Sequence, residues 1–133
     1  MRAFKSEFDR RNVAIVVISF AEPGRLVPYK EVYQLPFTIL ADPERKLYQA
    51  LGLRRLRWYR VFSLATLRDY LKQYRRALPQ LEPDRDDDIY QGGGNFVIDR
   101  GGNVIFAHRS EDPVDRPTMG ALLKAIDGNP NRL

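Results

Sequence analysis

Few residues in this chain are of types that could carry chemistry. The 133 residues contain one histidine, His108, and no cysteine. Without cysteine, these residues can form no disulfide, no thiolate metal site and no thiol nucleophile. A single histidine cannot build a zinc site of the usual all-protein kind. The sequence therefore predicts no catalytic residue, no metal ligand and no cofactor within these residues.

His108 and Arg109 form the first candidate pair, at the end of a predicted strand. Together they could hold an anion or tune a thiol. The alternative is a strand end followed by a surface arginine. We favour the alternative because no acidic or nucleophilic partner lies at a fixed spacing from them in the sequence.

Three adjacent carboxylates, Asp86, Asp87 and Asp88, suggest a divalent cation at first sight. A calcium loop alternates its ligands along the chain, and adjacent carboxylates lack that spacing. The run is therefore predicted to be a solvated loop.

The segment from 54 to 76 is both basic and aromatic. Its basic residues are Arg54, Arg55, Arg57, Arg60, Arg68, Lys72, Arg75 and Arg76. Such a stretch could contact a membrane surface or nucleic acid. The other interpretation is a solvated helix over a sheet, which we favour because no recognised nucleic-acid motif accompanies it. No specific nucleic-acid partner is expected.

The composition is that of an ordinary globular domain, with 44% hydrophobic residues, 29% charged residues and a net charge of +5. One domain spanning 1–133 is expected from this length. No apolar run approaches the length of a membrane span. The first eleven residues are too charged for a signal peptide, so a cytoplasmic location is predicted.

The elements that must position the candidates alternate between strands and helices. Phe4 and Phe8 share one face of a short helix within 1–11, and apolar runs predict strands at 13–20 and 37–41. A helix is expected over about 25–33 with Pro28 in its first turn. Asp42 and Pro43 predict the start of another helix, which ends at Gly52.

The second half of the sequence predicts an insertion followed by a hairpin. Helical spacing and then a polar loop occupy about 54–90. Strands at 95–98 and 103–107 flank the glycine turn Asp99-Arg-Gly-Gly102, and a closing helix ends near Gly128. Physical reasoning alone thus gives an α/β sheet with an antiparallel edge.

Three stretches make the chain resemble the peroxiredoxin-like AhpC/TSA family of the thioredoxin superfamily. They are Leu35-Pro-Phe-Thr-Ile-Leu-Ala-Asp-Pro-Glu-Arg-Lys-Leu-Tyr-Gln-Ala-Leu-Gly52, Gly93-Gly-Asn-Phe-Val-Ile-Asp-Arg-Gly-Gly-Asn-Val104 and His108-Arg-Ser-Glu-Asp-Pro-Val-Asp-Arg-Pro117. The three stretches follow one another in this order between residues 35 and 117. The resemblance implies a thioredoxin-like three-layer sandwich, with a mixed sheet and an antiparallel C-terminal hairpin.

The resemblance also implies which parts are missing. In the family, a central strand leads into a Cys-bearing turn at the start of a helix, where the helix N-terminus lowers the thiol pKa. In sequence, that strand and turn would come before Met1. In the sheet, the strand would lie between the strands at 13–20 and 95–98. We therefore expect an incomplete domain whose unpaired strand edges favour self-association.

The resemblance singles out one loop and one strand end as binding candidates. Gly92, Gly93 and Gly94, followed by Asn95, correspond to the segment that approaches the redox centre in a thioredoxin fold. His108 and Arg109 complete the set. The alternative, which we favour on residue types alone, is a tight glycine loop that enters a strand.

The family function is thiol-dependent antioxidant reduction, in which an activated Cys passes through a sulfenic acid. With no Cys, this chain is expected to be inactive alone, either as a degenerate homologue or as the remainder of a longer product. A thiol reductant is expected only if a Cys-containing N-terminus exists. The other hypotheses are a non-catalytic interaction module that uses residues 54–76, and a subunit completed by another chain.

Overall fold

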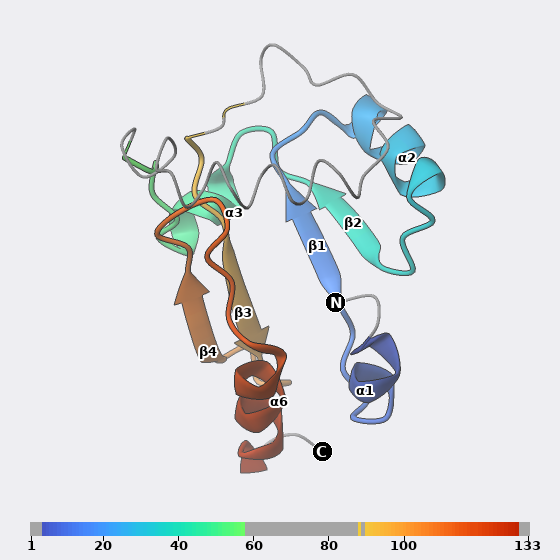
Figure 1. The fold of residues 1–133 in the computed structure, drawn as a ribbon, viewed down its shortest axis with the longest axis vertical. Helices are drawn as coiled ribbons and strands as arrows, with labels where there is room; N and C mark the ends of the chain where they lie inside the picture. Colours follow the sequence, from blue (N-terminus) through green and yellow to red (C-terminus); the bar gives the residue numbers. More distant parts are fainter. Residues whose placement is uncertain (1–3, 58–87, 89, 131–133) are drawn as a thin grey trace. The chain divides into compact units, whose positions relative to one another are not determined.

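The computed structural model describes residues 4–57, 88 and 90–130 (Figure 1). The chain divides into two compact units, Met1–Leu51 and Gly52–Leu133. Each unit is described by itself below. The expectation of one domain spanning 1–133 stays a prediction.

The first unit is built on two parallel strands, β1 (Val16–Ser19) and β2 (Thr38–Ala41). Val16 pairs with Thr38, and the register continues to Ser19 opposite Ala41. Parallel neighbours need a crossover connection, which helix α2 (Pro23–Val32) supplies. Both strands lie within the predicted ranges, and each is shorter than predicted.

Helix α2 begins earlier than the sequence pattern indicated. Pro23 stands in its first turn, and Pro28 lies inside the helix instead of opening it. The predicted start at about residue 25 is therefore wrong. The Pro23-Gly24 pair is typical of a break after a strand, yet proline is also favoured in the first turn of a helix, where an N–H has no intrahelical acceptor.

Asp42 caps helix α3 (Lys46–Ala50) from a distance. Its Oδ1 accepts a hydrogen bond from the Lys46 N–H at 2.9 Å, and its Oδ2 accepts from Leu47 N–H at 2.9 Å and Tyr48 N–H at 3.2 Å. Asp42 thus accepts from the first N–H groups of the helix, but the prediction of Asp42 at the N-cap and Pro43 as the first helical residue is wrong, because Arg45 is the N-cap. The helix itself starts later than predicted, because Arg45 takes a left-handed backbone with φ of 56° just before it.

Aromatic side chains tie these elements together within the first unit. The Tyr48 hydroxyl donates to the Ile18 carbonyl at 3.1 Å, and its ring meets Phe20 edge-on with centroids 5.9 Å apart. Helix α1 (Lys5–Asp9) buries Phe8 and leaves Phe4 exposed, although the sequence placed both on one face. Phe8 and Phe37 are the large apolar side chains that this unit buries among the described residues.

The second unit contains the predicted hairpin. Strands β3 (Gly94–Ile98) and β4 (Val104–Arg109) pair antiparallel, with an irregularity at Val97 and Ile98. In the turn, Asp99 Oδ1 accepts from the Asn103 N–H at 2.8 Å, and Gly102 has a φ of 82° that favours glycine. The hairpin prediction is confirmed.

Helix α6 (Met119–Asp127) packs against this hairpin and supplies its core. Leu122 and Ile126 are buried at 4% and 2% exposure. The Thr118 side chain caps the helix by accepting from the Ala121 N–H at 3.3 Å. The closing helix predicted before Gly128 is confirmed.

The predicted insertion at 54–90 falls largely on residues 58–87 and 89, which lie outside the described residues. Its two ends are held together. Arg55 and Gln91 form an antiparallel bridge, and the Leu56 N–H donates to the Tyr90 carbonyl at 2.6 Å. The described residues thus form a mixed α/β structure with a parallel sheet and an antiparallel hairpin, which agrees with the partial thioredoxin-like fold predicted.

Candidate functional site

Strand pairing brings the predicted site residues side by side in the second unit. Gly94 lies opposite Arg109, and Asn95 lies opposite His108. The ladder continues outward, because the Ser110 N–H donates to the Gly93 carbonyl at 2.9 Å. Residues about 15 positions apart in sequence therefore meet at one end of the hairpin.

The three consecutive glycines differ in what surrounds them. A Cβ on Gly92 would lie 2.5 Å from the Arg54 carbonyl oxygen, and a Cβ on Gly94 would lie 2.7 Å from the His108 carbonyl oxygen. Both positions thus require glycine for close backbone packing. A Cβ on Gly93 would meet no described atom within 4 Å, and its backbone is not left-handed. Of these three glycines, Gly93 is the one at which no described atom would clash with a side chain.

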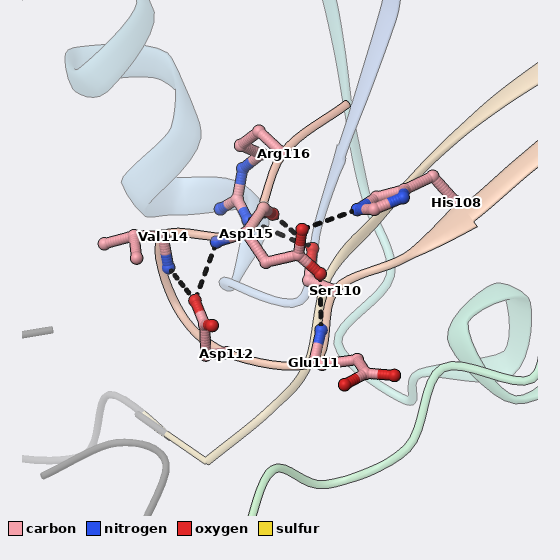
Figure 2. A network of polar contacts seen from close by, with 7 residues as sticks. All are labelled: His108, Ser110, Glu111, Asp112, Val114, Asp115 and Arg116. Atoms are coloured by element: carbon pink, nitrogen blue, oxygen red, sulfur yellow. Dashed lines mark hydrogen bonds and ion pairs between the residues drawn. The ribbon is translucent and has the colours of Figure 1, made fainter. Parts of the chain in front are cut away.

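His108 has an acidic partner that the sequence analysis missed. Its Nε2 lies 3.0 Å from Asp115 Oδ1, and both side chains are partly buried, at 28% and 27% exposure (Figure 2). The earlier statement that no acidic partner lies at a fixed spacing is therefore wrong. The two lie seven positions apart across the loop that follows β4, so the fold of that loop brings them together.

Asp115 organises that loop through both its side chain and its backbone. Its Oδ2 accepts from the Glu111 N–H at 2.8 Å, and its carbonyl accepts from Ser110 Oγ at 2.9 Å and Arg116 Nη1 at 2.6 Å. Asp112 forms the turn, since its Oδ1 accepts from the Val114 and Asp115 N–H groups (Figure 2).

This network contains a serine, a histidine and an aspartate, but it is not arranged as a nucleophilic triad. A triad needs the hydroxyl on one ring nitrogen and the carboxylate on the other. Here Ser110 Oγ donates to a backbone carbonyl and accepts from Arg116 Nη1 at 3.0 Å. The geometry closes the loop between β4 and α6 and leaves Ser110 unactivated.

A cavity of about 640 Å³ opens beside the glycine loop. It is lined by residues 52–57, residues 109–111 and Gly93. Arg109, at the end of β4, places its guanidinium over the ring of Phe96 on β3, 5.4 Å from the ring centroid. Of the predicted candidates, Gly93 and Arg109 line this cavity. Leu53 and Leu56 also line it, and no sequence motif singled them out.

Asp88 is not the solvated residue that the sequence predicted. Its side chain is only 13% exposed and pairs with Arg55 through two contacts, 2.8 and 3.1 Å long. Asp86 and Asp87 lie outside the described residues. Across residues 4–57, 88 and 90–130, no group of three or more histidine, cysteine or acidic residues could hold a metal ion.

No helix within the described ranges is both long and apolar enough to cross a membrane. In the basic stretch 54–76, the structure describes residues 54–57, which include Arg54, Arg55 and Arg57, and residues 58–76 lie outside the described residues.

A family model described as AhpC/TSA antioxidant enzyme matches residues 1–112. The chain belongs to this AhpC/TSA family. The match spans both strand pairs and ends at Asp112, in the loop after β4, and the prediction of a peroxiredoxin-like family member is confirmed. The AhpC/TSA chain described here has no cysteine in its 133 residues.

Curated relatives carry the name Peroxiredoxin-like 2C. The human protein is 24% identical over 92% of this chain and 57% of its own length. The mouse protein is 24% identical over 95% of this chain and 58% of its own length, and the bovine protein is 23% identical over 92% and 56%. The AhpC/TSA chain thus spans less than three-fifths of the relatives it matches.

Proposed function

We propose that this chain serves thiol-dependent antioxidant chemistry in the cytoplasm as a peroxiredoxin-like scaffold, and that its own residues perform no thiol step. The observation that carries the proposal is a family match over residues 1–112 in a sequence with no cysteine. Peroxide reduction by a thiol needs a sulfur that becomes sulfenic acid. The sulfur would have to come from residues outside these 133.

The geometry supports a scaffold role. The most polar cluster near the glycine loop, around His108 and Asp115, uses its donors and acceptors to close a loop. Ser110 lies two positions after His108 in sequence and carries a hydroxyl that could act as a nucleophile. That hydroxyl donates to the Asp115 carbonyl and accepts from Arg116 Nη1. No side chain in this cluster is arranged to attack a peroxide.

A coupled peroxidase assay tests the proposal. The purified chain is incubated with hydrogen peroxide, thioredoxin, thioredoxin reductase and NADPH, beside an active peroxiredoxin as positive control. We expect NADPH oxidation no faster than without the chain. Turnover of about 1 per second or more, an ordinary enzymatic rate, would overturn the proposal.

The nucleotide sequence upstream of the Met1 codon would show whether the thiol belongs to the same polypeptide or to another chain. An in-frame strand followed by a Cys-x-x-Cys turn would place the thiol in the same polypeptide. Without such a segment, the thiol would have to come from another chain, and the same assay with candidate partners added becomes the test.

We further propose that the first unit self-associates through its sheet. Val16, Val17 and Leu40 are exposed there, although parallel strands are usually covered on both faces. Light scattering at high micromolar concentration should show oligomers. Val16→Lys should shift the distribution toward monomer, because an edge charge opposes strand addition. A monodisperse monomer in the unmodified chain would contradict this proposal.

A further inference from the structure

We propose that the cavity beside the glycine loop binds a small organic anion, with its oxyanion group held by arginine and its apolar body against leucine. The described lining of the cavity belongs to the second unit, with residues 52–57 and residues 109–111 as its main parts. Its volume of about 640 Å³ is that of a small-molecule site. The proposal goes beyond the redox assignment and does not depend on it.

Charge is the first argument. Four arginines line the cavity, at positions 54, 55, 57 and 109, against a single acid among the described lining residues, Glu111. Asp88 pairs with Arg55, and the lining residues that the structure describes carry more positive than negative charges. Arginine suits this role because its planar fork matches carboxylate and phosphate oxygens.

The state of individual arginines is the second argument. Arg54 is exposed, and its side chain makes no hydrogen bond or ion pair with the described residues. Its backbone is fixed, because its carbonyl accepts from the Gly92 N–H at 3.1 Å. Arg109 is oriented by the Phe96 ring on one side, and its Nε would lie 3.2 Å from a Cβ on Gly52. Fixed backbones reduce the entropy lost when side chains close on a ligand.

Gly93 is the third argument. Close packing explains glycine at 92 and 94, but no described atom excludes a side chain at 93. Gly93 lines the cavity, so the missing side chain keeps that wall open. The backbone can then approach a ligand, as glycine permits. Leu53 and Leu56 supply the apolar part of the lining.

Four probes separate the chemistry of the ligand: phenyl phosphate, benzoate, inorganic phosphate and benzyl alcohol. Binding is measured by calorimetry and by backbone amide shifts of Gly93 and Ser110. We expect saturable binding of phenyl phosphate or benzoate, and the tighter of the two identifies a phosphate or a carboxylate ligand. Inorganic phosphate should bind more weakly because it lacks the apolar body. Absence of saturable binding by both aromatic anions, or equal binding of benzyl alcohol, would overturn the proposal.

Three variants and one matched control locate the site. Arg54→Gln and Arg109→Gln should each weaken binding about tenfold, as expected for loss of a charge-assisted hydrogen bond. Glu111→Gln should tighten it about two- to fivefold by removing a repelling charge. Arg100→Gln removes the same charge from the exposed turn at the other end of the hairpin and should leave binding unchanged. Equal losses in Arg54→Gln and Arg100→Gln would show non-specific attraction and overturn the proposal.

A steric variant tests the open wall independently of charge. Gly93→Leu should abolish binding while the far-ultraviolet circular dichroism stays unchanged, because the side chain enters open space. Unaltered binding in this variant would contradict the site as placed. An acidic peptide that binds more tightly than every small anion would also overturn the proposal, since the surface would then serve a protein partner.

Discussion

The two compact units of this chain differ in how they cover their strands. In the second unit, α6 packs on the β3–β4 hairpin and Ile126 is 2% exposed, although Ile98 and Val104 beside the turn are 57% and 49% exposed. In the first unit, strand residues Val16 and Leu40 are each 49% exposed, and α2 buries none of its residues. The candidate site lies in the unit whose helix buries apolar residues against its strands.

The difference follows from strand direction. An antiparallel hairpin is closed by a short turn and needs one covering helix, whereas a parallel pair needs a crossover and cover on both faces. Among the described residues, α6 buries Leu122 and Ile126 beside the hairpin, whereas α2 buries none of its residues beside the parallel pair. A rigid hairpin end can therefore hold a cavity in place, while the parallel pair still has apolar surface to cover.

Core truncation gives the largest expected difference between the units. Ile126→Ala should lower the free energy of unfolding by about 2–5 kcal/mol, because it leaves a cavity under α6. Leu40→Ala, at an exposed strand position, should cost less than about 1 kcal/mol. Urea denaturation followed by circular dichroism measures both. Equal losses would mean that Leu40 is covered in solution, and the comparison would fail.

The glycine loop gives the next largest effect, and it sharpens the comparison within the second unit. Gly94→Ala should cost about 1–3 kcal/mol, since its Cβ would lie 2.7 Å from the His108 carbonyl oxygen. Gly93→Ala should change stability by about 0.5 kcal/mol or less. The same urea series measures both. A large loss in Gly93→Ala would show that residues near that position pack on it, which would also remove the argument for an open cavity wall.

Sequence patterns predicted the elements that depend on neighbours in the chain. The glycine turn between two apolar runs predicted the hairpin, and Asp42 predicted a capping contact, because both signals act within a few residues. The start of α2 was missed because Pro23-Gly24 is compatible with both a strand break and a helix start. Local chemistry alone does not choose between them.

The candidate site was predicted only in part, for the same reason. Gly93 and Arg109 were identified, but the cavity also needs residues 52–57 opposite them, and no short-range pattern specifies that contact. The His108–Asp115 pair depends on the turn that Asp112 builds between the two residues. Long-range and loop-dependent contacts are decided by the fold, so sequence periodicity carries no sign of them.

Loss of the hydrogen bonds around Asp115 should lower stability less than Ile126→Ala or Gly94→Ala. Asp115→Ala removes the acceptors for the Glu111 N–H and the His108 ring and should cost about 1–2 kcal/mol. Glu44→Ala removes an exposed ion pair with Lys46 in the first unit and should cost about 0.5 kcal/mol or less. Urea denaturation gives the free energies, and hydrogen exchange at the Glu111 amide localises the change. An unchanged Glu111 exchange rate in Asp115→Ala would contradict the network.

The smallest effect concerns alkaline pH and the first unit. Burial raises the pKa of Tyr48 above its ordinary 10.0, and the nearby Asp42 carboxylate raises it further, while Arg45 opposes them. The folded chain then holds the phenol proton more tightly than the unfolded chain. This contribution to stability is fully present below about pH 10 and is lost as pH rises through the folded pKa.

Tyr48→Phe tests that sign. At neutral pH the variant should lose about 1 kcal/mol or less, because the hydrogen bond to the Ile18 carbonyl disappears. Between about pH 9 and about pH 11, however, its free energy of unfolding should fall less steeply than that of the unmodified chain, since the shifted group is gone. Tyr29, whose pKa burial also raises, remains in both proteins and leaves a shared slope. A steeper alkaline loss in Tyr48→Phe would mean that Tyr48 ionises more readily when folded, and that its contacts in the first unit are not formed in solution.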